Sequence, residues 1–140
     1  MNGAPDDIRA LPTVVYIEDD DPCADLVTDG LRDQCRILRA SDGLAGLALV
    51  ERIIPALVLV DVRLPALSGF EVIERLRANP PTTDIPVLAI SARIMAGEEA
   101  RAKKLGCRGF VRKPFRLATL RREVDAALAE APRGAARVPP

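Results

Sequence analysis

Short apolar runs alternate along the chain with segments in which apolar residues recur at helical spacing. The apolar runs are rich in Val, Ile and Leu, and they cover five ranges: Thr13–Ile17, Cys35–Ala40, Ala56–Val60, Ile85–Ile90 and Gly109–Val111. Runs of this kind are typical of buried strands, whereas recurrence every three or four positions is typical of amphipathic helices. The pattern therefore predicts strands and helices in strict alternation.

Each predicted helix follows one of these strands and has an apolar face. The expected faces consist of Cys23, Leu26, Val27 and Leu31; of Leu44, Leu47 and Ala48; of Val72, Ile73 and Leu76; of Ala100 and Leu105; and of Leu117, Leu120, Val124, Ala127 and Leu128. Several aspartates and Ser41 stand where helix N-caps are expected. The predicted order is (βα)₅.

Strict alternation of this kind calls for a parallel sheet with helices on both faces. Each right-handed crossover lays a helix on one side of the sheet or the other. The range Ala56–Val60 is apolar throughout, as expected for a strand that is buried on both faces. Five units are too few for a closed barrel of about eight strands. We therefore expect an α/β, doubly wound five-stranded parallel sheet in the flavodoxin-like order 2-1-3-4-5.

Length and composition favour one globular domain outside membranes. A chain of 140 residues has the size of one ordinary domain. Its apolar runs are shorter than the ~18 residues of a membrane span, and Asp6 and Asp7 stand where a signal peptide needs an apolar core. The three cysteines have neither close pairing nor metal-ligand spacing, which is typical of reduced thiols. We expect a cytoplasmic protein with its domain at 13–130 and flexible tails at 1–12 and 131–140.

The charge balance argues against two classes of partner. The chain has 20 basic and 20 acidic residues, so no overall field draws it to nucleic acid or to anionic lipid. The charges are nevertheless segregated, with acidic residues gathered between Glu18 and Asp33 and basic residues between Arg101 and Arg122. We expect neither nucleic acid nor a membrane as partner.

Polar residues follow four of the predicted strands, at the edge where open parallel sheets bind their ligands. Glu18 and Asp19 follow the first strand, Asp61 the third, Ser91 the fourth and Lys113 the fifth. Two carboxylates about 5 Å apart repel by about 3 kcal/mol at an effective dielectric constant of about 20, so a cation must offset them. Carboxylate oxygens suit Mg²⁺, and the chain has no histidine for zinc or copper.

A carboxylate beside such a cation can act as a nucleophile toward a phosphoryl group. Asp61 ends the central strand and suits that role. Ser91 can donate its hydroxyl to a phosphoryl oxygen, and Lys113 supplies a compact positive charge. Phosphoryl transfer depends chiefly on positioning and electrostatics of this kind. The sequence therefore predicts Asp61 as a phosphoryl acceptor with Mg²⁺ as its cofactor.

Four stretches resemble the CheY-like receiver domain of two-component response regulators. They are Val15–Asp20, Asp61–Gly69, Ile90–Ala92 and Phe110–Phe115, which occur in receiver order and spacing within a similarity that covers roughly Thr13 to Ala129. The resemblance implies direct metal ligation by Asp19, Asp61 and the backbone carbonyl of Arg63, with Glu18 acting mostly through water. It also implies a cis peptide bond between Lys113 and Pro114.

The same resemblance implies a function and its partners. A histidine kinase or histidine phosphotransfer protein would phosphorylate Asp61, and Lys113 would form a salt bridge with the phosphoryl group. Ser91 and Phe110 would form the switch pair. The chemistry would be Mg²⁺-dependent self-phosphorylation and autodephosphorylation. A downstream protein would bind the face formed by the fourth helix, fifth strand and fifth helix, and the short stretch after the fifth helix favours a single-domain regulator without a DNA-binding module.

Other interpretations stay open at this point. The protein can be an intermediate phosphate relay or sink between histidine proteins rather than a signalling endpoint. An aspartyl phosphatase of the dehalogenase type needs a second aspartate two residues after the first, where this chain has Arg63. A third possibility is an interaction module that works without phosphorylation. A further hypothesis is that Arg63 and Arg93 flank the phosphoryl group and alter its lifetime.

Overall fold

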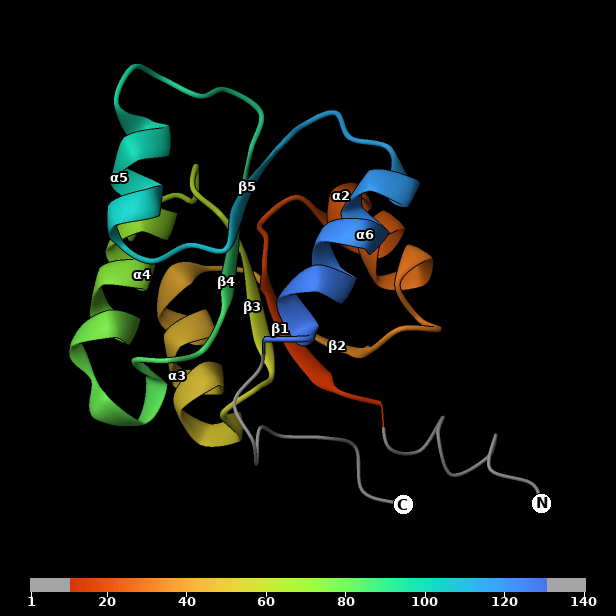
Figure 1. Cartoon of the computed structure of the whole chain (residues 1–140), viewed down its shortest axis with the longest axis horizontal. Coiled ribbons are helices and arrows are strands. Elements are labelled where there is room, and N and C mark those ends of the chain that lie inside the picture. Colours follow the sequence, from red (N-terminus) through yellow and green to blue (C-terminus); the bar gives the residue numbers. More distant parts are fainter. Residues whose placement is uncertain (1–10, 131–140) are drawn as a thin grey trace.

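Five parallel strands lie between two layers of helices in this computed structural model, which describes residues 11–130 (Figure 1). The strands are β1 (Thr13–Ile17), β2 (Arg36–Ala40), β3 (Leu57–Asp61), β4 (Val87–Ser91) and β5 (Gly109–Arg112). The helices are α2 (Asp21–Gly30), α3 (Gly43–Ile53), α4 (Gly69–Ala78), α5 (Glu98–Lys104) and α6 (Leu117–Leu128), with a 3₁₀ turn η1 at Pro80–Thr82. The predicted alternation is confirmed. The tails expected at 1–12 and 131–140 fall, apart from residues 11 and 12, outside the described residues.

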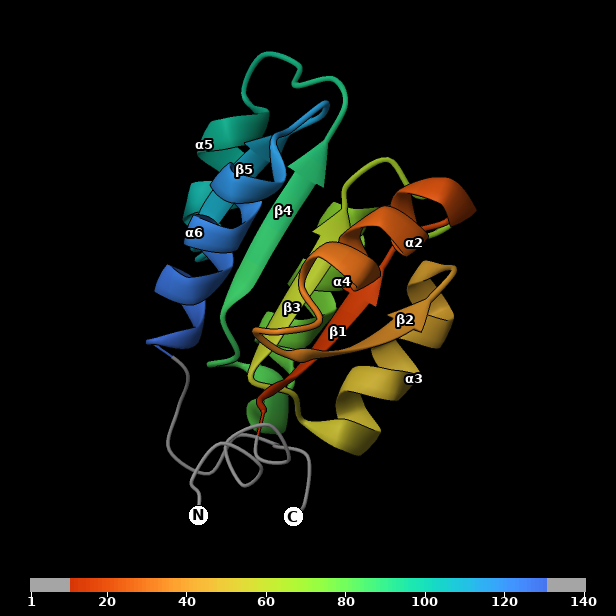
Figure 2. The same ribbon diagram turned by 90° about the vertical axis from the view of Figure 1, so that its right-hand side faces the viewer.

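The strands pair in the order β2-β1-β3-β4-β5, and every pair is parallel. This is the predicted order 2-1-3-4-5. The order reverses at β1, which lies between β2 and β3, and the carboxyl ends of all strands point to one edge of the sheet (Figure 2). Ligand sites of doubly wound sheets lie at such a reversal.

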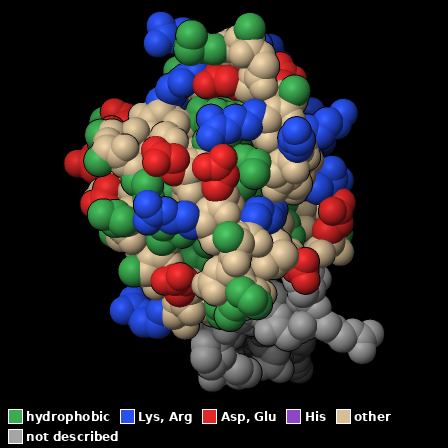
Figure 3. Space-filling view, turned by 90° about the vertical axis from the view of Figure 1, so that its left-hand side faces the viewer, with side chains coloured by type: hydrophobic (Ala, Val, Ile, Leu, Met, Phe, Trp, Pro, Cys, Tyr) green, Lys and Arg blue, Asp and Glu red, His purple; other side chains and the backbone are tan. Residues whose placement is uncertain are grey.

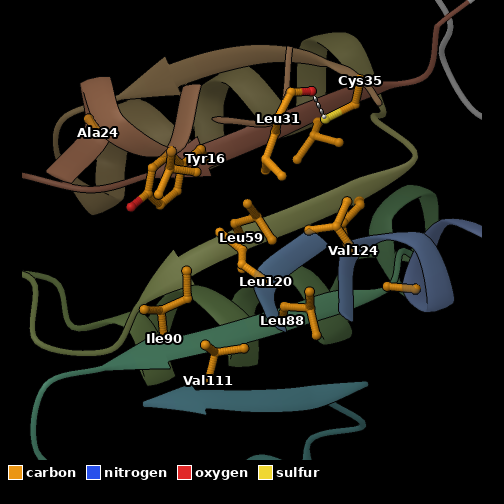
Figure 4. Close-up of a cluster of buried hydrophobic side chains, with 14 residues drawn as sticks. Tyr16, Ala24, Leu31, Cys35, Leu59, Leu88, Ile90, Val111, Leu120 and Val124 are labelled. Atoms are coloured by element: carbon orange, nitrogen blue, oxygen red, sulfur yellow. Dashed lines mark hydrogen bonds between the residues drawn. The ribbon is translucent and has the colours of Figure 1, made fainter. Parts of the chain in front are cut away.

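Helices cover both faces of the sheet, so residues alternate between two cores along each central strand. Helices α2 and α6 lie on one face, and α3, α4 and α5 on the other (Figure 1). In β1, Val14 and Tyr16 belong to the core under α2 and α6, whereas Val15 and Ile17 belong to the opposite core. Figure 4 shows the first of these cores. Strands β1, β3 and β4 are buried throughout because both of their faces are covered.

The predicted apolar faces of α3 and α2 are wrong in part. Leu44 is 63% exposed and Ala48 is also exposed, while the buried residues of α3 are Gly43, Gly46, Leu47 and Val50. The helix lies so close to β1 that a Cβ at Gly46 would come 2.3 Å from Cδ1 of Ile17. A search for large apolar residues overlooks a face made partly of glycine. Leu26 of α2 is likewise 54% exposed.

The expected N-cap of α3 and the expected apolar face of α5 also need correction. The N-cap of α3 is Asp42, whose side chain accepts a hydrogen bond from the first turn, and not Ser41. In α5 the buried residue is Ala102, whereas Ala100 is exposed and Leu105 lies just after the helix. A helix of only 7 residues presents too few positions for its spacing to identify the buried face. Within residues 11–130, no helix combines the length and the apolar composition that a membrane crossing requires.

Candidate functional site

Three carboxylates from two neighbouring strands meet at the carboxyl edge of the sheet. Glu18 and Asp19 directly follow β1, and Asp61 is the last residue of β3. One oxygen of each carboxylate lies within 4.8 Å of the other two. Because β1 and β3 are adjacent and parallel, their ends deliver these side chains to one place. Glu18 and Asp61 are buried and Asp19 is exposed, so the cluster opens to solvent on one side.

Lys113 brings a positive charge from the end of β5. Its Nζ lies 2.7 Å from Oε1 of Glu18 and 2.9 Å from Oδ2 of Asp61. Burial by itself would lower the pKa of Lys113, but its hydrogen bonds to the two carboxylates and their negative charges raise that pKa above its usual range. Lys113 is therefore an ammonium ion at neutral pH. Three carboxylates and one ammonium leave two negative charges.

The carboxylate of Glu18 is enclosed by donors. The side chain is 0% exposed. The hydroxyl of Tyr16 donates to Oε1 at 3.1 Å, and the backbone N–H of Asp20 donates to Oε2 at 3.2 Å. Burial raises the pKa of Glu18, the hydrogen bond from Lys113 opposes the increase, and the charge of Asp61 adds to it, with a raised pKa as the result. The ionised carboxylate is thus costly in this state, and a further cation nearby would stabilise it.

Asp61 is oriented by one donor on each oxygen. The backbone N–H of Arg63 donates to Oδ1 at 2.8 Å, and Lys113 donates to Oδ2. The backbone around Asp61 is equally constrained, because α4 begins directly against it. A Cβ at Gly69 would lie 2.4 Å from the carbonyl oxygen of Asp61.

Ser91 ends β4, the next strand along the sheet, and is fully buried. Its hydroxyl donates to the carbonyl of Arg93 at 2.6 Å and accepts the N–H of the same residue at 3.2 Å. The structure thus brings the end of β4 beside the end of β3, but these hydrogen bonds of the Ser91 hydroxyl are with its own loop and not with Asp61.

This arrangement of strand-end acids, hydroxyl and lysine lies within a stretch that matches a known family. Residues 14–125 match the response regulator receiver domain. The chain belongs to the response regulator receiver domain family. It is therefore the receiver domain of a two-component response regulator.

Individual relatives agree with this assignment. Over 106 residues the receiver is 34% identical to the DNA-binding dual master transcriptional regulator RpaA of Synechocystis, with 75% of this chain and 44% of RpaA covered. Over 78 residues it is 37% identical to the polar-differentiation response regulator DivK of Brucella anthropi, with 56% of this chain and 63% of DivK covered. The chain thus spans about half the length of these two relatives.

A solved structure with the same fold contains a metal ion. The receiver domain of the sensor histidine kinase PA1611 from Pseudomonas aeruginosa superposes with a TM-score of 0.78 at 25% sequence identity, covering 86% of this chain and 99% of that domain. That structure has a magnesium ion coordinated in its active site cleft. Receiver domains generally bind Mg²⁺ in an acidic site.

The acidic cluster of this receiver fits such an ion. Hard carboxylate oxygens are the ligands that Mg²⁺ prefers, and it usually takes one or two of them together with waters. The two negative charges left after Lys113 is counted match one divalent cation. Asp19 is exposed and Asp61 is only 5% exposed, so an ion would lie where solvent reaches the cluster.

The remaining residues expected around the site lie on the β4 and β5 side. Phe110 of β5 is half-buried and packs against the small core of Val62, Phe70, Ala89 and Ala102. The Lys113–Pro114 peptide bond is cis, as the receiver resemblance implied. The cluster that Phe110 packs against includes residues of α4 and α5, so Phe110 lies on the face of the sheet opposite α6.

The side chain of Arg63 is bound to the β4–α5 loop. Its Nη2 forms an ion pair with Glu98 and donates to the carbonyl of Arg93 at 3.0 Å. Arg93 itself is exposed. The hypothesis that the two arginines alter the lifetime of a phosphoryl group stays a prediction, which dephosphorylation rates of Arg63→Ala and Arg93→Ala proteins would test.

Sequence reasoning missed three residues that shape the site. Tyr16 contacts Glu18 from within β1, and Glu98 holds Arg63. Arg39 of β2 donates from Nε and Nη2 to the carbonyl of Glu18 at 3.0 and 2.7 Å, and its Nη1 pairs with Asp21 at 2.7 Å. One sequence feature could have identified Tyr16 and Arg39. Each is a polar residue inside a predicted buried strand beside the site.

Proposed function

We propose that Asp61 accepts a phosphoryl group from a phosphohistidine of a histidine kinase or histidine phosphotransfer protein in a Mg²⁺-dependent reaction. The observation that carries the proposal is the position of Asp61, at the end of the central strand with Lys113 Nζ 2.9 Å from Oδ2 and two further carboxylates within 4.8 Å. Receiver domains act with histidine proteins of these kinds.

The transfer exchanges one bond to phosphorus for another. A carboxylate oxygen of Asp61 attacks the phosphorus, the bond from phosphorus to the imidazole nitrogen breaks, and that nitrogen keeps the electron pair and takes up a proton. Bound Mg²⁺, held by Asp19, Asp61 and the backbone carbonyl of Arg63, would supply positive charge for the phosphoryl oxygens. Lys113, which bonds Asp61 and Glu18, would supply a second positive charge to the phosphoryl oxygens, and Glu18 would hold the ion mostly through water.

An apolar groove beside the site supports docking of the histidine protein. Its volume is about 540 Å³, and its lining residues include Pro22, Leu26, Lys113, Pro114 and Phe115. Leu26, on α2, is 54% exposed. A partner helix that presents a phosphohistidine could cover this groove and bring the histidine within reach of Asp61.

The output would be a change at the face formed by α5, β5 and α6. The hydroxyl of Ser91 would leave the carbonyl of Arg93 for a phosphoryl oxygen, and the ring of Phe110 would turn inward. Phe110 also lines a hollow of about 370 Å³ between α5 and β5, so its movement would change the shape of that surface. Basic and acidic side chains lie close together on the face that α4 and α5 present (Figure 3), which favours a protein partner of mixed charge.

A small phosphodonor tests the central proposal. The receiver is incubated with acetyl phosphate and Mg²⁺, and the intact protein is weighed. We expect the addition of one phosphoryl group, its loss in Asp61→Asn, and its loss when EDTA removes the metal. The matched control is Asp33→Asn, which removes an exposed carboxylate from the turn between α2 and β2. Equal labelling of Asp61→Asn would contradict the proposal.

Two further questions need their own measurements. Transfer of the label from phosphorylated receiver to a second histidine protein would identify a relay or sink rather than an endpoint. The single-domain character of the regulator stays a prediction, which the size of the native protein on an immunoblot would check.

A further inference from the structure

Three polar groups connect the surface of α2 with the acidic site. The sulfur of Cys23 lies 3.6 Å from the hydroxyl of Tyr16, and that hydroxyl lies 3.1 Å from Oε1 of Glu18. The same Oε1 accepts from Lys113, which also bonds Asp61. Three hydrogen bonds thus connect the Tyr16 hydroxyl with Asp61, by way of Glu18 and Lys113.

The direction of the bonds at Tyr16 follows from the chemistry of its neighbours. A carboxylate can only accept, so the hydroxyl hydrogen points to Glu18, and the thiol of Cys23 donates to the phenolic oxygen. Burial first, with the nearby charge of Glu18 adding to it, raises the pKa of Tyr16 far above its usual range. The hydroxyl therefore stays a donor throughout the physiological pH range.

Packing of the core does not require the Tyr16 hydroxyl. Tyr16 is 0% exposed and lies in the apolar core under α2 and α6, beside Ala24 (Figure 4). Every other residue of β1 except Thr13 is aliphatic. A phenylalanine would fill nearly the same volume, so the contribution of the hydroxyl is its bond to Glu18.

We propose that Tyr16 is a positioning residue for metal binding, because its hydroxyl holds the carboxylate of Glu18 in the rotamer that faces Asp19 and Asp61. This inference rests on the proposed function. Glu18 has three protein donors: Tyr16 and Lys113 on Oε1, and the N–H of Asp20 on Oε2. Of the two side-chain donors, Tyr16 is the neutral one, so its hydroxyl orients the carboxylate without cancelling its charge. Groups that orient metal-binding side chains typically contribute about 10- to 100-fold to metal affinity.

Tyr16→Phe removes the hydroxyl and keeps the ring. We expect the dissociation constant for Mg²⁺, measured by calorimetric titration of the intact protein with magnesium chloride, to rise about tenfold, the low end of that range because Lys113 and Asp20 still hold Glu18. The matched control is Thr82→Val, which removes another buried hydroxyl that donates to the Leu76 carbonyl at 2.6 Å, far from the site in the α4–β4 connection. Its Mg²⁺ affinity should equal that of the wild type.

A spectroscopic signature gives a second readout that needs no variant of Tyr16. The chain has one tyrosine and no tryptophan, so the part of its near-ultraviolet circular dichroism that does not come from phenylalanine reports on Tyr16. We expect the tyrosine signal to change as Mg²⁺ saturates the wild type, and to stay constant in Asp19→Asn over the same titration.

The outcomes separate this inference from the proposed function. An affinity of Tyr16→Phe within twofold of the wild type, while the wild type binds Mg²⁺ and Asp61 is phosphorylated, overturns the role of Tyr16 alone. A wild type that binds no Mg²⁺ overturns both. If Tyr16→Phe does not fold, the wild-type titration decides, and a tyrosine signal unchanged at Mg²⁺ saturation overturns the inference.

Discussion

The guanidinium of Arg63, in the loop after β3, forms an ion pair with Glu98, the first residue of α5. The same Nη2 donates to the carbonyl of Arg93, and the same carboxylate oxygen of Glu98 accepts the N–H of Met95 at 2.8 Å. These bonds tie the loop after the proposed phosphorylation site to the loop that holds the Ser91 hydroxyl. The carbonyl that accepts from Ser91 is the one that accepts from Arg63.

Breaking this ion pair should ease the movement of Ser91. In Glu98→Gln the Arg63 guanidinium loses its charged partner, so the loop from Ser91 to Glu98 is held less firmly. A partly exposed pair contributes up to about 1 kcal/mol, which corresponds to a rate change of about fivefold at most. We expect phosphoryl incorporation from acetyl phosphate, followed by intact mass, to be a few-fold faster. Glu74→Gln, which breaks the exposed pair with Arg101, is the control, and equal rates for the two variants would refute the prediction.

Neutralising Glu18 should stabilise the metal-free receiver at neutral pH. The pKa of Glu18 is raised, chiefly by burial, so the folded state is favoured when Glu18 is protonated and loses stability as pH rises through and above the usual glutamate range. Glutamine does not ionise, so the Glu18→Gln protein does not lose stability in this way as pH rises. In urea denaturation with EDTA, we expect Glu18→Gln to be more stable than the wild type near pH 7, with the difference vanishing below about pH 4.

Added Mg²⁺ supplies the control for that comparison. It should stabilise the wild type at neutral pH and affect Glu18→Gln less, because the variant lacks one of the three negative charges. A wild type more stable than Glu18→Gln at neutral pH without metal would show that the bond to Lys113 outweighs the cost of burying Glu18.

Gly69 should not tolerate a side chain. A Cβ there would lie 2.4 Å from the carbonyl oxygen of Asp61 and 2.5 Å from Cα of Val62, and backbone atoms cannot rotate out of the way as side chains do. Gly69→Ala should therefore destabilise the fold by about 1–3 kcal/mol, although alanine favours helices. Thermal unfolding measures the loss. The control is Ala78→Gly at the exposed end of α4, which should cost about 0.5–1 kcal/mol, and a stabilised Gly69→Ala would contradict the model of close contact.

Arg77 of α4 is expected to contribute strongly to stability. Its guanidinium donates to four backbone carbonyls at 2.7–3.2 Å, those of Thr83, Ile85, Leu105 and Gly106. It thereby joins the end of α4 to the connections before β4 and β5. Arg77→Met keeps the length of the side chain but leaves these carbonyls without their donor, which should cost about 2–4 kcal/mol in denaturant unfolding.

Arg75 provides the comparison for this substitution. It lies on the same helix and is exposed. Arg75→Met should change the stability by no more than about 0.5 kcal/mol. Equal losses for the two variants would mean that the bonds of Arg77 contribute nothing beyond helix propensity.

The order of strands and helices followed from the sequence because burial has a local period. Strands β1, β3 and β4 are buried on both faces, so their residues are apolar in unbroken runs that are visible without a structure. Parallel strands that end at one edge must bring their last residues together. The convergence of Glu18, Asp19, Asp61 and Lys113 therefore follows from topology and position alone.

Only the tertiary structure decided which partner each polar side chain bonds. Arg63 bonds Glu98, 35 residues away, and Lys113 bonds Glu18, 95 residues away. The burial of Gly46 depends on how closely α3 approaches Ile17, which no local pattern records. Residues close in sequence share a period that the apolar pattern reveals. Hydrogen bonds and contacts between distant residues instead depend on how precisely the elements pack, and that precision exists only once the chain has folded.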